Sequence, residues 1–256
     1  MPGQVVLITG ANNGIGLALT KALLADGYRV AAFDLSGEKL AGLTDQYTMN
    51  LRFYICDVTD ADRVQAAVAS VIAEWKEIDI LVNNACLAFF CPYEDKPLAD
   101  TRREFEVNYF GYLHTIDAVL PHMKSKRKGI IHNFSSSVGI SGFPGIYGYV
   151  STKGAIEGLT RTLSIEFQRY GITVNLVHPP LTRTKSAAPL GIPEQFMADP
   201  NDVGRKLAKK IGSTKSIVTP DIAASFGVFI ARHFPEAMGR FLGARTEAAR
   251  EHAGRG

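Results

Sequence analysis

The sequence predicts an α/β fold in which helices cover both faces of an open, doubly wound parallel β-sheet. Short, continuous apolar segments recur along the chain, as expected of strands that are buried on both faces. Stretches with apolar residues at helical spacing lie between these segments. The first segment runs into a glycine-rich turn, which is typical of this fold class. A length of 256 residues suits one such unit, so we expect a single domain over residues 1–256.

The composition indicates a globular protein with a substantial core and nearly balanced charge. Hydrophobic residues make up 46% of the chain, and the net charge of +3 is too small to indicate a nucleic-acid partner. Cys56, Cys86 and Cys91 have neither the number nor the spacing of a disulfide framework or a zinc site, so we expect no metal. We find no signal peptide and no apolar stretch of about 18 residues, so we expect a soluble, cytoplasmic protein.

Residues 5–9 form the first expected strand, and a turn with the spacing Gly-x-x-x-Gly-x-Gly follows at residues 10–16. The helical pattern after the turn ends at Gly27, a natural C-cap. Glycines allow close backbone approach, while the helix N-terminus offers free N–H groups and a positive dipole end. This order predicts a nucleotide-binding site, and an ordinary turn between strand and helix is the alternative.

The second expected strand, residues 28–33, ends at Asp34. An acidic side chain there, roughly 20 residues after the glycine turn, accepts hydrogen bonds from the adenosine ribose and repels a 2′-phosphate. Asn12 and Asn13 bring no positive charge to the turn. These features favour NAD over NADP. The alternative is that Asp34 only caps the next helix.

The remaining elements follow the same alternation of apolar segments and helical patterns. Further expected strands span residues 51–58, 78–82, 129–134, 171–177 and 215–219. Further expected helices span residues 61–75, 100–126, 150–167, 202–211 and 222–230.

Tyr149 and Lys153 lie four residues apart in an expected helix, so their side chains share one helix face. Free tyrosine has a pKa of about 10. A nearby positive charge lowers this pKa because it favours the phenolate. We therefore expect a group that donates and accepts protons near neutral pH. A Tyr-x-x-x-Lys pair also arises by chance, so an exposed helical pair is the alternative.

The turn Thr9-Gly10-Ala11-Asn12-Asn13-Gly14-Ile15-Gly16 and the pair Tyr149-x-x-x-Lys153 together resemble the short-chain dehydrogenase/reductase family. The resemblance extends to about residue 184 in the family's order and spacing. It implies a Rossmann-type sheet of seven strands in the order 3-2-1-4-5-6-7, with helices on both faces.

The resemblance also implies a cofactor site. Asp57 and Val58 would hold the adenine ring, although a helix cap is the alternative role of Asp57. Asn84 and Ala85 would line the cofactor groove. The implied cofactor-binding residues are Gly10, Asn12, Asn13, Gly14, Ile15, Gly16, Asp34, Leu35, Asp57, Val58, Asn84, Ala85, Tyr149, Lys153, Pro179, Leu181, Thr182 and Thr184.

Catalysis is assigned by the same resemblance to Asn108, Ser136, Tyr149 and Lys153. Ser136 would donate a hydrogen bond to the substrate oxygen, and Tyr149 would exchange a proton with that oxygen. Lys153 would lower the tyrosine pKa and hold the nicotinamide ribose. Asn108 would hold a water that connects Lys153 to solvent, whereas a bond back to its own helix is the alternative.

Aromatic and apolar residues near the expected site favour an apolar substrate. Residues 87–93 form an aromatic loop, and residues 185–200 form an expected lid with an apolar inner face. The alternatives are that the loop only covers the sheet edge and that the lid is a disordered surface loop. The expected substrate contacts are Ser136, Phe89, Phe143, Leu190 and Phe196, with Phe90 and Met197 as further apolar contributors.

Three features depart from the family pattern. Cys86 and Pro180 replace glycines, so we expect a narrower pocket floor and a stiffer loop. Residues 234–256 replace the usual Asp-Gly-Gly ending. This tail is open to interpretation as a lid, a dimer contact, a membrane-surface helix or disorder, and its mixed charge argues against a membrane anchor. The family implies a homodimer or homotetramer, and the atypical tail weakens the case for the tetramer.

The sequence thus predicts an NAD-dependent oxidoreductase that interconverts a secondary alcohol and a ketone, with an apolar small molecule such as a steroid, a lipid-like or an alicyclic alcohol as substrate. One alternative is a non-catalytic NAD-binding or sensing protein, against which the intact Ser136, Tyr149 and Lys153 argue. The other is a nucleotide-sugar epimerase or dehydratase, which the length of the chain disfavours.

Overall fold

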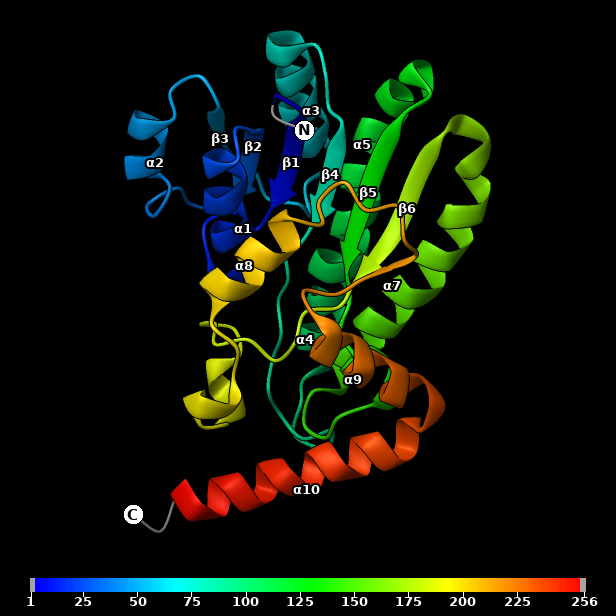
Figure 1. Cartoon of the computed structure of the whole chain (residues 1–256). Coiled ribbons are helices and arrows are strands. Elements are labelled where there is room, and N and C mark those ends of the chain that lie inside the picture. Colours follow the sequence, from blue (N-terminus) through cyan, green and yellow to red (C-terminus); the bar gives the residue numbers. More distant parts are fainter. Residues whose placement is uncertain (1–2, 254–256) are drawn as a thin grey trace.

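Seven parallel strands form one sheet in the order β3-β2-β1-β4-β5-β6-β7, which confirms the predicted topology (Figure 1). The computed structural model describes residues 3–253, and side chains are described up to residue 244. The order of the strands reverses between β1 and β4, and ligands of such sheets bind at the carboxyl ends of the strands near this point. The strands are β1 Val5–Thr9, β2 Arg29–Asp34, β3 Leu51–Ile55, β4 Ile80–Asn83, β5 Gly129–Phe134, β6 Ile172–Val177 and β7 Ile217–Val218.

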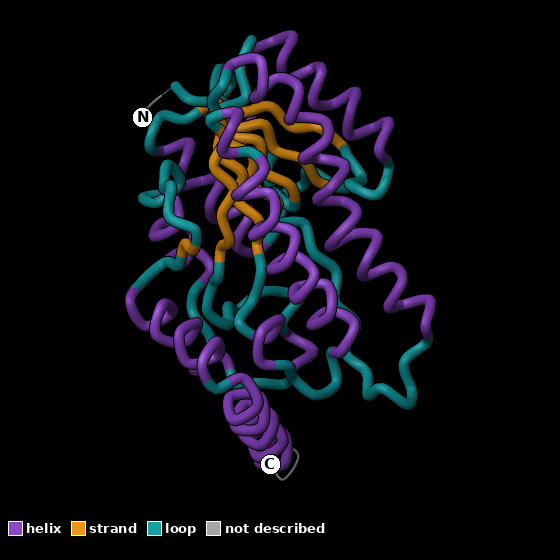
Figure 2. The backbone as a smooth tube through the Cα atoms, turned by 90° about the vertical axis from the view of Figure 1, so that its right-hand side faces the viewer, coloured by secondary structure: helices purple, strands orange, loops and turns teal. Residues whose placement is uncertain are grey.

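The helices form a layer on each face of the sheet (Figures 1 and 2). They are α1 Gly14–Ala25, α2 Ala41–Gln46, α3 Ala61–Trp75, α4 Leu98–Phe105, α5 Gly111–Lys126, α6 Val138–Ser141, α7 Tyr147–Glu166, α8 Pro200–Ala208, α9 Ile222–His233 and α10 Pro235–Ala253. A π-helix, Glu106–Phe110, joins α4 to α5, and short 3-10 turns lie at Gln168–Tyr170, Ala188–Leu190 and Glu194–Phe196.

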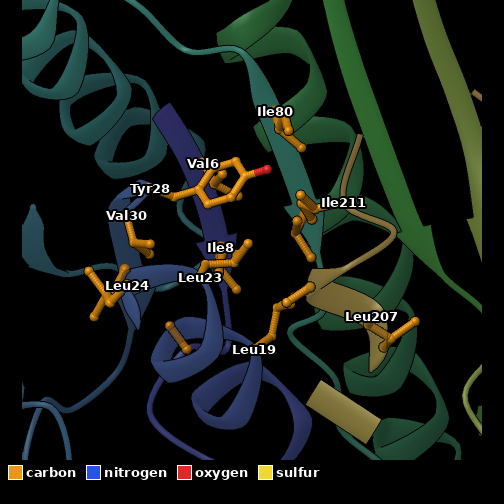
Figure 3. Packing of buried hydrophobic residues seen from close by; sticks show 14 of the residues in the cluster. Val6, Ile8, Leu19, Leu23, Leu24, Tyr28, Val30, Ile80, Leu207 and Ile211 are labelled. Carbon is orange, nitrogen blue, oxygen red and sulfur yellow. The ribbon is translucent and has the colours of Figure 1, made fainter. Parts of the chain in front are cut away.

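Alternate residues of the central strands pack against the helices on opposite faces of the sheet. Val6 and Ile8 of β1 pack with α1 and α8, as Figure 3 shows for Leu19, Leu23 and Leu207. Val5 and Leu7 point to the opposite face, where α3, α5 and the end of α7 cover them. All four of these apolar residues are fully buried, which explains why the strand is a continuous apolar run.

The elements differ from the predicted ones in several places, and α2 and α6 had no predicted counterpart. The expected helix over residues 100–126 is divided by the π-helix, and the third and seventh strands are shorter than expected. Disorder, one of the four interpretations of the tail, is wrong for its described residues: α10 is a long helix that runs across the end of the molecule opposite the N-terminus (Figures 1 and 2). Residues 254–256 of the expected tail lie outside the described residues. No helix within residues 3–253 is long and apolar enough to cross a membrane.

Candidate active site

The glycine turn between β1 and α1 has the tight shape that the sequence predicts. Gly10 and Gly14 adopt positive φ angles of 67° and 51°, which L side chains rarely adopt. A Cβ atom on Gly16 would overlap the carbonyl oxygen of Gly10, so only glycine lets the helix start so close to the strand. A Cβ on Gly14 would lie 2.9 Å from the Thr184 side chain, so the loop after β6 packs against the turn.

Asp34 stands at the end of β2 beside this turn. Its carboxylate accepts hydrogen bonds from the backbone N–H groups of Asn12, at 2.8 Å, and Leu35, at 2.8 Å. Asn12 is buried, and its side chain bonds Ser36 and the Lys39 backbone rather than facing a ligand. The Lys39 ammonium donates to the Asn13 amide oxygen at 2.6 Å, so a basic group that sequence reasoning missed lies at the turn.

Hydrogen bonds of asparagines and threonines join the segments in the middle of the sheet. Asn83 donates to Asn133 at 3.0 Å, which joins β4 to β5. The Thr9 hydroxyl accepts from the backbone N–H groups of Asn84 and Ala85 at 3.1 and 3.0 Å, and so fixes the groove wall after β4. Thr9 had no predicted role, and its place at the end of a buried strand was the available signal.

Asp57 shapes the turn before α3 and does not cap that helix. Its carboxylate accepts from the backbone N–H and the hydroxyl of Thr59, at 2.9 and 2.8 Å, which shapes the turn before α3. Asp60, not Asp57, is the N-cap of that helix and accepts from the Arg63 N–H at 2.9 Å. Asp57 and Val58 also line the large cavity described below.

Tyr149 and Lys153 lie in the first two turns of α7, and Ser136 follows β5. The Lys153 ammonium is buried, with its nitrogen 5.5 Å from the centre of the Tyr149 ring. It donates to the Phe134 carbonyl at 2.8 Å and to the Tyr112 hydroxyl at 3.5 Å. Tyr112 is a fully buried partner on α5 that the sequence analysis missed, since its position four residues after Asn108 carried no motif.

The protein itself raises the pKa of Tyr149 above its ordinary value. Burial of the phenol is the main cause, Cys86 acts in the same direction, and a hydrogen bond with Ser136 lowers the pKa. The prediction that Lys153 brings this pKa down toward neutral pH is therefore wrong for the chain's own residues, because the effect of burial prevails. The Lys153 ammonium donates to the Phe134 carbonyl and the Tyr112 hydroxyl. Burial of the Tyr149 phenol disfavours the phenolate and so raises the pKa that the lysine charge was expected to lower. Cys86 is exposed on the cavity wall with its thiol in hydrogen-bonding reach of Lys153.

Asn108 lies in the π-helix and is fully buried. Its amide oxygen accepts from the Leu87 N–H at 2.7 Å, and its amide nitrogen donates to the Leu87 carbonyl at 2.8 Å and to Thr152 at 3.1 Å. The side chain therefore bonds across to the loop after β4 and to α7, and not back to its own helix. Asn108 thus bonds the residue that directly precedes Lys153 in the chain.

A single cavity of about 1400 Å³ connects these groups. It exceeds the roughly 300–1,000 Å³ of an ordinary small-molecule pocket, and thus has room for two ligands. Its lining includes all three of Ser136, Tyr149 and Lys153. The expected cofactor residues on its wall are Gly10, Asn13, Gly14, Ile15, Asp34, Leu35, Asp57, Val58, Asn84, Ala85, Pro179, Leu181, Thr182 and Thr184.

Among the described residues, the lining omits five that the sequence assigned to the site: Asn12, Gly16, Phe89, Asn108 and Met197. Asn12, Gly16 and Asn108 support the wall from behind, because all three are buried. Phe90 lines the cavity in place of Phe89, whose backbone is bound instead to Glu104 and Lys96. Phe143, Leu190 and Phe196 reach the cavity as expected.

A doubly wound sheet with a glycine turn and a Tyr–Lys pair on one cavity is the arrangement of a nicotinamide-dependent oxidoreductase. The chain belongs to the short-chain dehydrogenase family, whose model, described as short chain dehydrogenase, matches residues 4–194. It is accordingly an oxidoreductase that acts on small alcohols or ketones with a nicotinamide cofactor. The helix α10 lies beyond the matched part of the chain.

Curated relatives and solved structures show the same similarity. A 3-alpha-(or 20-beta)-hydroxysteroid dehydrogenase of Mycobacterium tuberculosis is 33% identical over 182 residues, which cover 71% of this chain and 70% of the relative. A D-threitol dehydrogenase of Mycolicibacterium smegmatis is 33% identical over 234 residues, 90% of this chain and 86% of the relative. The structure of a short-chain dehydrogenase from Streptomyces avermitilis is 27% identical, with a TM-score of 0.79 over 89% of this chain and 92% of that one.

Proposed function

We propose that the protein is an NAD-dependent dehydrogenase that interconverts an apolar secondary alcohol and the corresponding ketone. The observation that carries the proposal is the position of Ser136, Tyr149 and Lys153 on one cavity that extends to the glycine turn and Asp34. A cofactor that spans from Asp34 to Lys153 would leave its reactive end beside the Tyr149 phenol. This placement rests on the residues that line the cavity and agrees with the binding rule for sheets of this type.

The chain's own groups hold the substrate oxygen and move its proton. In ketone reduction the neutral Tyr149 phenol donates a proton to the substrate oxygen, while the Ser136 hydroxyl donates a hydrogen bond to the same atom. In alcohol oxidation the phenolate accepts that proton. Lys153 holds a positive charge beside the ring, 5.5 Å from its centre, and favours the phenolate. A nicotinamide cofactor held along this cavity would supply or accept the hydride.

The substrate end of the cavity supports an apolar ligand. The names of the relatives do not distinguish an apolar substrate from a polar one, because one relative is a hydroxysteroid dehydrogenase and another is a dehydrogenase of the polyol D-threitol. The lining of the cavity supports the apolar assignment, because it is rich in aromatic and branched side chains: Phe90, Val138, Phe143, Ile146, Leu190, Ile192 and Phe196. Burial of an apolar substrate against such a surface is favoured by about 25 cal/mol per Å².

The proposal is tested by assaying a panel of secondary alcohols and ketones with NAD and NADP in parallel. We expect reduced nicotinamide to form or disappear fastest with alicyclic, steroid or fatty substrates and with NAD. Turnover of small polyols alone would overturn the apolar assignment. Binding of NADH with no turnover of any alcohol or ketone would instead support a non-catalytic, NAD-sensing role.

Replacing Asp34 with asparagine should shift the cofactor preference toward NADP. Asparagine keeps an oxygen that accepts from the Asn12 N–H but removes the charge that repels a 2′-phosphate. We expect the ratio of kcat/KM for NADP over NAD to rise by roughly tenfold or more, equal to about 1.4 kcal/mol. Adding Lys39→Ala should remove part of this gain, because the Lys39 ammonium lies at the turn. An unchanged ratio in Asp34→Asn would contradict the role of Asp34.

The two reaction directions should depend differently on pH. Burial and Cys86 raise the pKa of Tyr149, so the phenol stays protonated around neutral pH. Ketone reduction uses the protonated phenol, so its kcat/KM should not change with pH around neutrality. Alcohol oxidation uses the phenolate, so its kcat/KM should rise as the pH rises. Cys86→Gly removes one cause of the raised pKa and should move the rise in oxidation to lower pH. Profiles of kcat/KM against pH in both directions check this, and an oxidation rate that falls with rising pH would refute it.

A further inference from the structure

The first half of α10 forms part of the wall of the active-site cavity. Met238, Phe241 and Leu242 line the same cavity as Ser136 and Tyr149. Their spacing places them on one face of the helix. On another face, Glu236 and Arg240 are 85% and 84% exposed, so the helix is polar outward and apolar toward the cavity.

Two glycines bring the α10 backbone close to the catalytic segment. A Cβ atom on Gly239 would lie 2.5 Å from the carbonyl oxygen of Ser141, and one on Gly243 would lie 3.0 Å from Pro144. Ser141 and Pro144 belong to the connection between Ser136 and Tyr149. Because Gly239 and Gly243 are four residues apart, they form one small-residue face, and the helix rests there on the segment that joins the two catalytic groups.

Residues 185–200 supply another part of the same cavity wall. Leu190, Ile192 and Phe196 line the cavity together with the three α10 side chains. Leu190 is buried, whereas Phe196 and Phe241 are 65% and 54% exposed. Aromatic surface of this extent beside a catalytic cavity is surface that an apolar ligand can cover.

We propose that α10 determines the substrate range of the enzyme, with Met238, Phe241 and Leu242 binding the part of the substrate that is remote from the reacting carbon. This rests on the proposed function, which it extends from apolar secondary alcohols and ketones in general to those with an extended alkyl chain or fused-ring body. A short ketone fills the space beside Tyr149 and Ser136 and leaves α10 uncovered. A long ketone reaches α10 and gains its apolar contacts.

The test compares butanone with methyl nonyl ketone, which share the reacting group and differ in chain length. The wild type should have a much higher kcat/KM for the long ketone. In the double variant Phe241→Ala/Leu242→Ala, the long-over-short ratio of kcat/KM should fall about tenfold or more. Arg240→Ala on the exposed face of the same helix is the matched control and should leave both values unchanged.

A second pair of variants tests the attachment of α10. Gly239→Ala places a methyl group against the Ser141 carbonyl and should displace the helix, which lowers the same ratio. Gly227→Ala in α9 is its control, because an added Cβ there meets nothing within 4 Å. If both Phe241→Ala/Leu242→Ala and Gly239→Ala keep the wild-type ratio, the assignment of α10 is wrong.

Calorimetric binding of the two ketones to the protein with NADH separates this inference from the proposed function. A wild type that binds methyl nonyl ketone far more tightly than butanone, and loses this difference in the double variant, supports the role of α10 even without turnover. Turnover of neither ketone nor of any alcohol would defeat the proposed function alone. Equal binding of the two ketones by the wild type would overturn the role of α10.

Discussion

Replacing Tyr149 with phenylalanine is expected to lower kcat by roughly 10²–10⁴-fold, the usual contribution of a positioned acid or base. The substitution removes one oxygen and leaves the ring in place, so the cavity keeps its shape. Ser136 and Lys153 cannot replace the lost group. Serine has no accessible pKa in this range, and the Lys153 ammonium is already bonded to the Phe134 carbonyl at 2.8 Å. The dissociation constant for NADH should stay close to that of the wild type.

Tyr147→Phe provides the matched control for this variant. Tyr147 lies two residues earlier on the same helix, and its hydroxyl accepts from Thr101 at 2.9 Å. Tyr147 is not among the described residues that line the cavity. We expect Tyr147→Phe to retain most of the wild-type rate in the alcohol and ketone assay. A Tyr149→Phe enzyme that keeps a near-normal rate would remove the basis of the proposed mechanism.

The sheet and its cofactor edge were predictable because they depend on local patterns. Strands that are buried on both faces, such as β1, must be apolar throughout, and this makes them visible in the sequence. Gly16 was visible for a similar reason: a Cβ there would overlap the Gly10 carbonyl, so only glycine suits the turn. In both cases the sequence pattern follows directly from one steric requirement.

Other features depend on tertiary contacts that leave no local pattern. The π-helix interrupts a helical pattern whose periodicity gives no warning, and within it Asn108 bonds the Leu87 backbone, which is far from it in the sequence. The position of α10 on the molecule could not be predicted from the sequence either. Its apolar spacing indicates a helix but not the surface that the helix covers. The four-residue spacing of Gly239 and Gly243 was the one available sign of close packing.

A buried ion pair beside the catalytic helix was also missed, because Lys96 and Glu104 look like ordinary surface residues in the sequence. Both side chains are fully buried, and they lie 2.6 Å apart. Glu104 also accepts from the Phe89 N–H at 2.8 Å, and Lys96 donates to the Phe89 carbonyl at 3.3 Å. A Cβ on Gly148 would overlap the Glu104 carboxylate. The pair therefore sets the position of the backbone immediately before Tyr149.

Neutralising one partner of this pair is expected to have a large effect on stability. Glu104→Gln keeps an oxygen for the Phe89 N–H but leaves the Lys96 ammonium buried without a counter-charge. Breaking a buried pair in this way costs about 3–5 kcal/mol in the free energy of unfolding. Urea denaturation measures the change. Glu236→Gln is the control, because its ion pair with Arg240 is exposed and should contribute nothing measurable.

The double variant Lys96→Met/Glu104→Gln separates the stability of the pair from its effect on the active site. Removing both charges eliminates the desolvation cost, so most of the lost stability should return. The rate should not return to the same extent, because the contacts of Lys96 with the Phe89 carbonyl and the Tyr147 ring, 5.0 Å from its nitrogen, are also lost. A fully recovered kcat would mean that the pair serves stability alone. A stable enzyme with low kcat and unchanged NADH affinity would show that the buried charges position Tyr149.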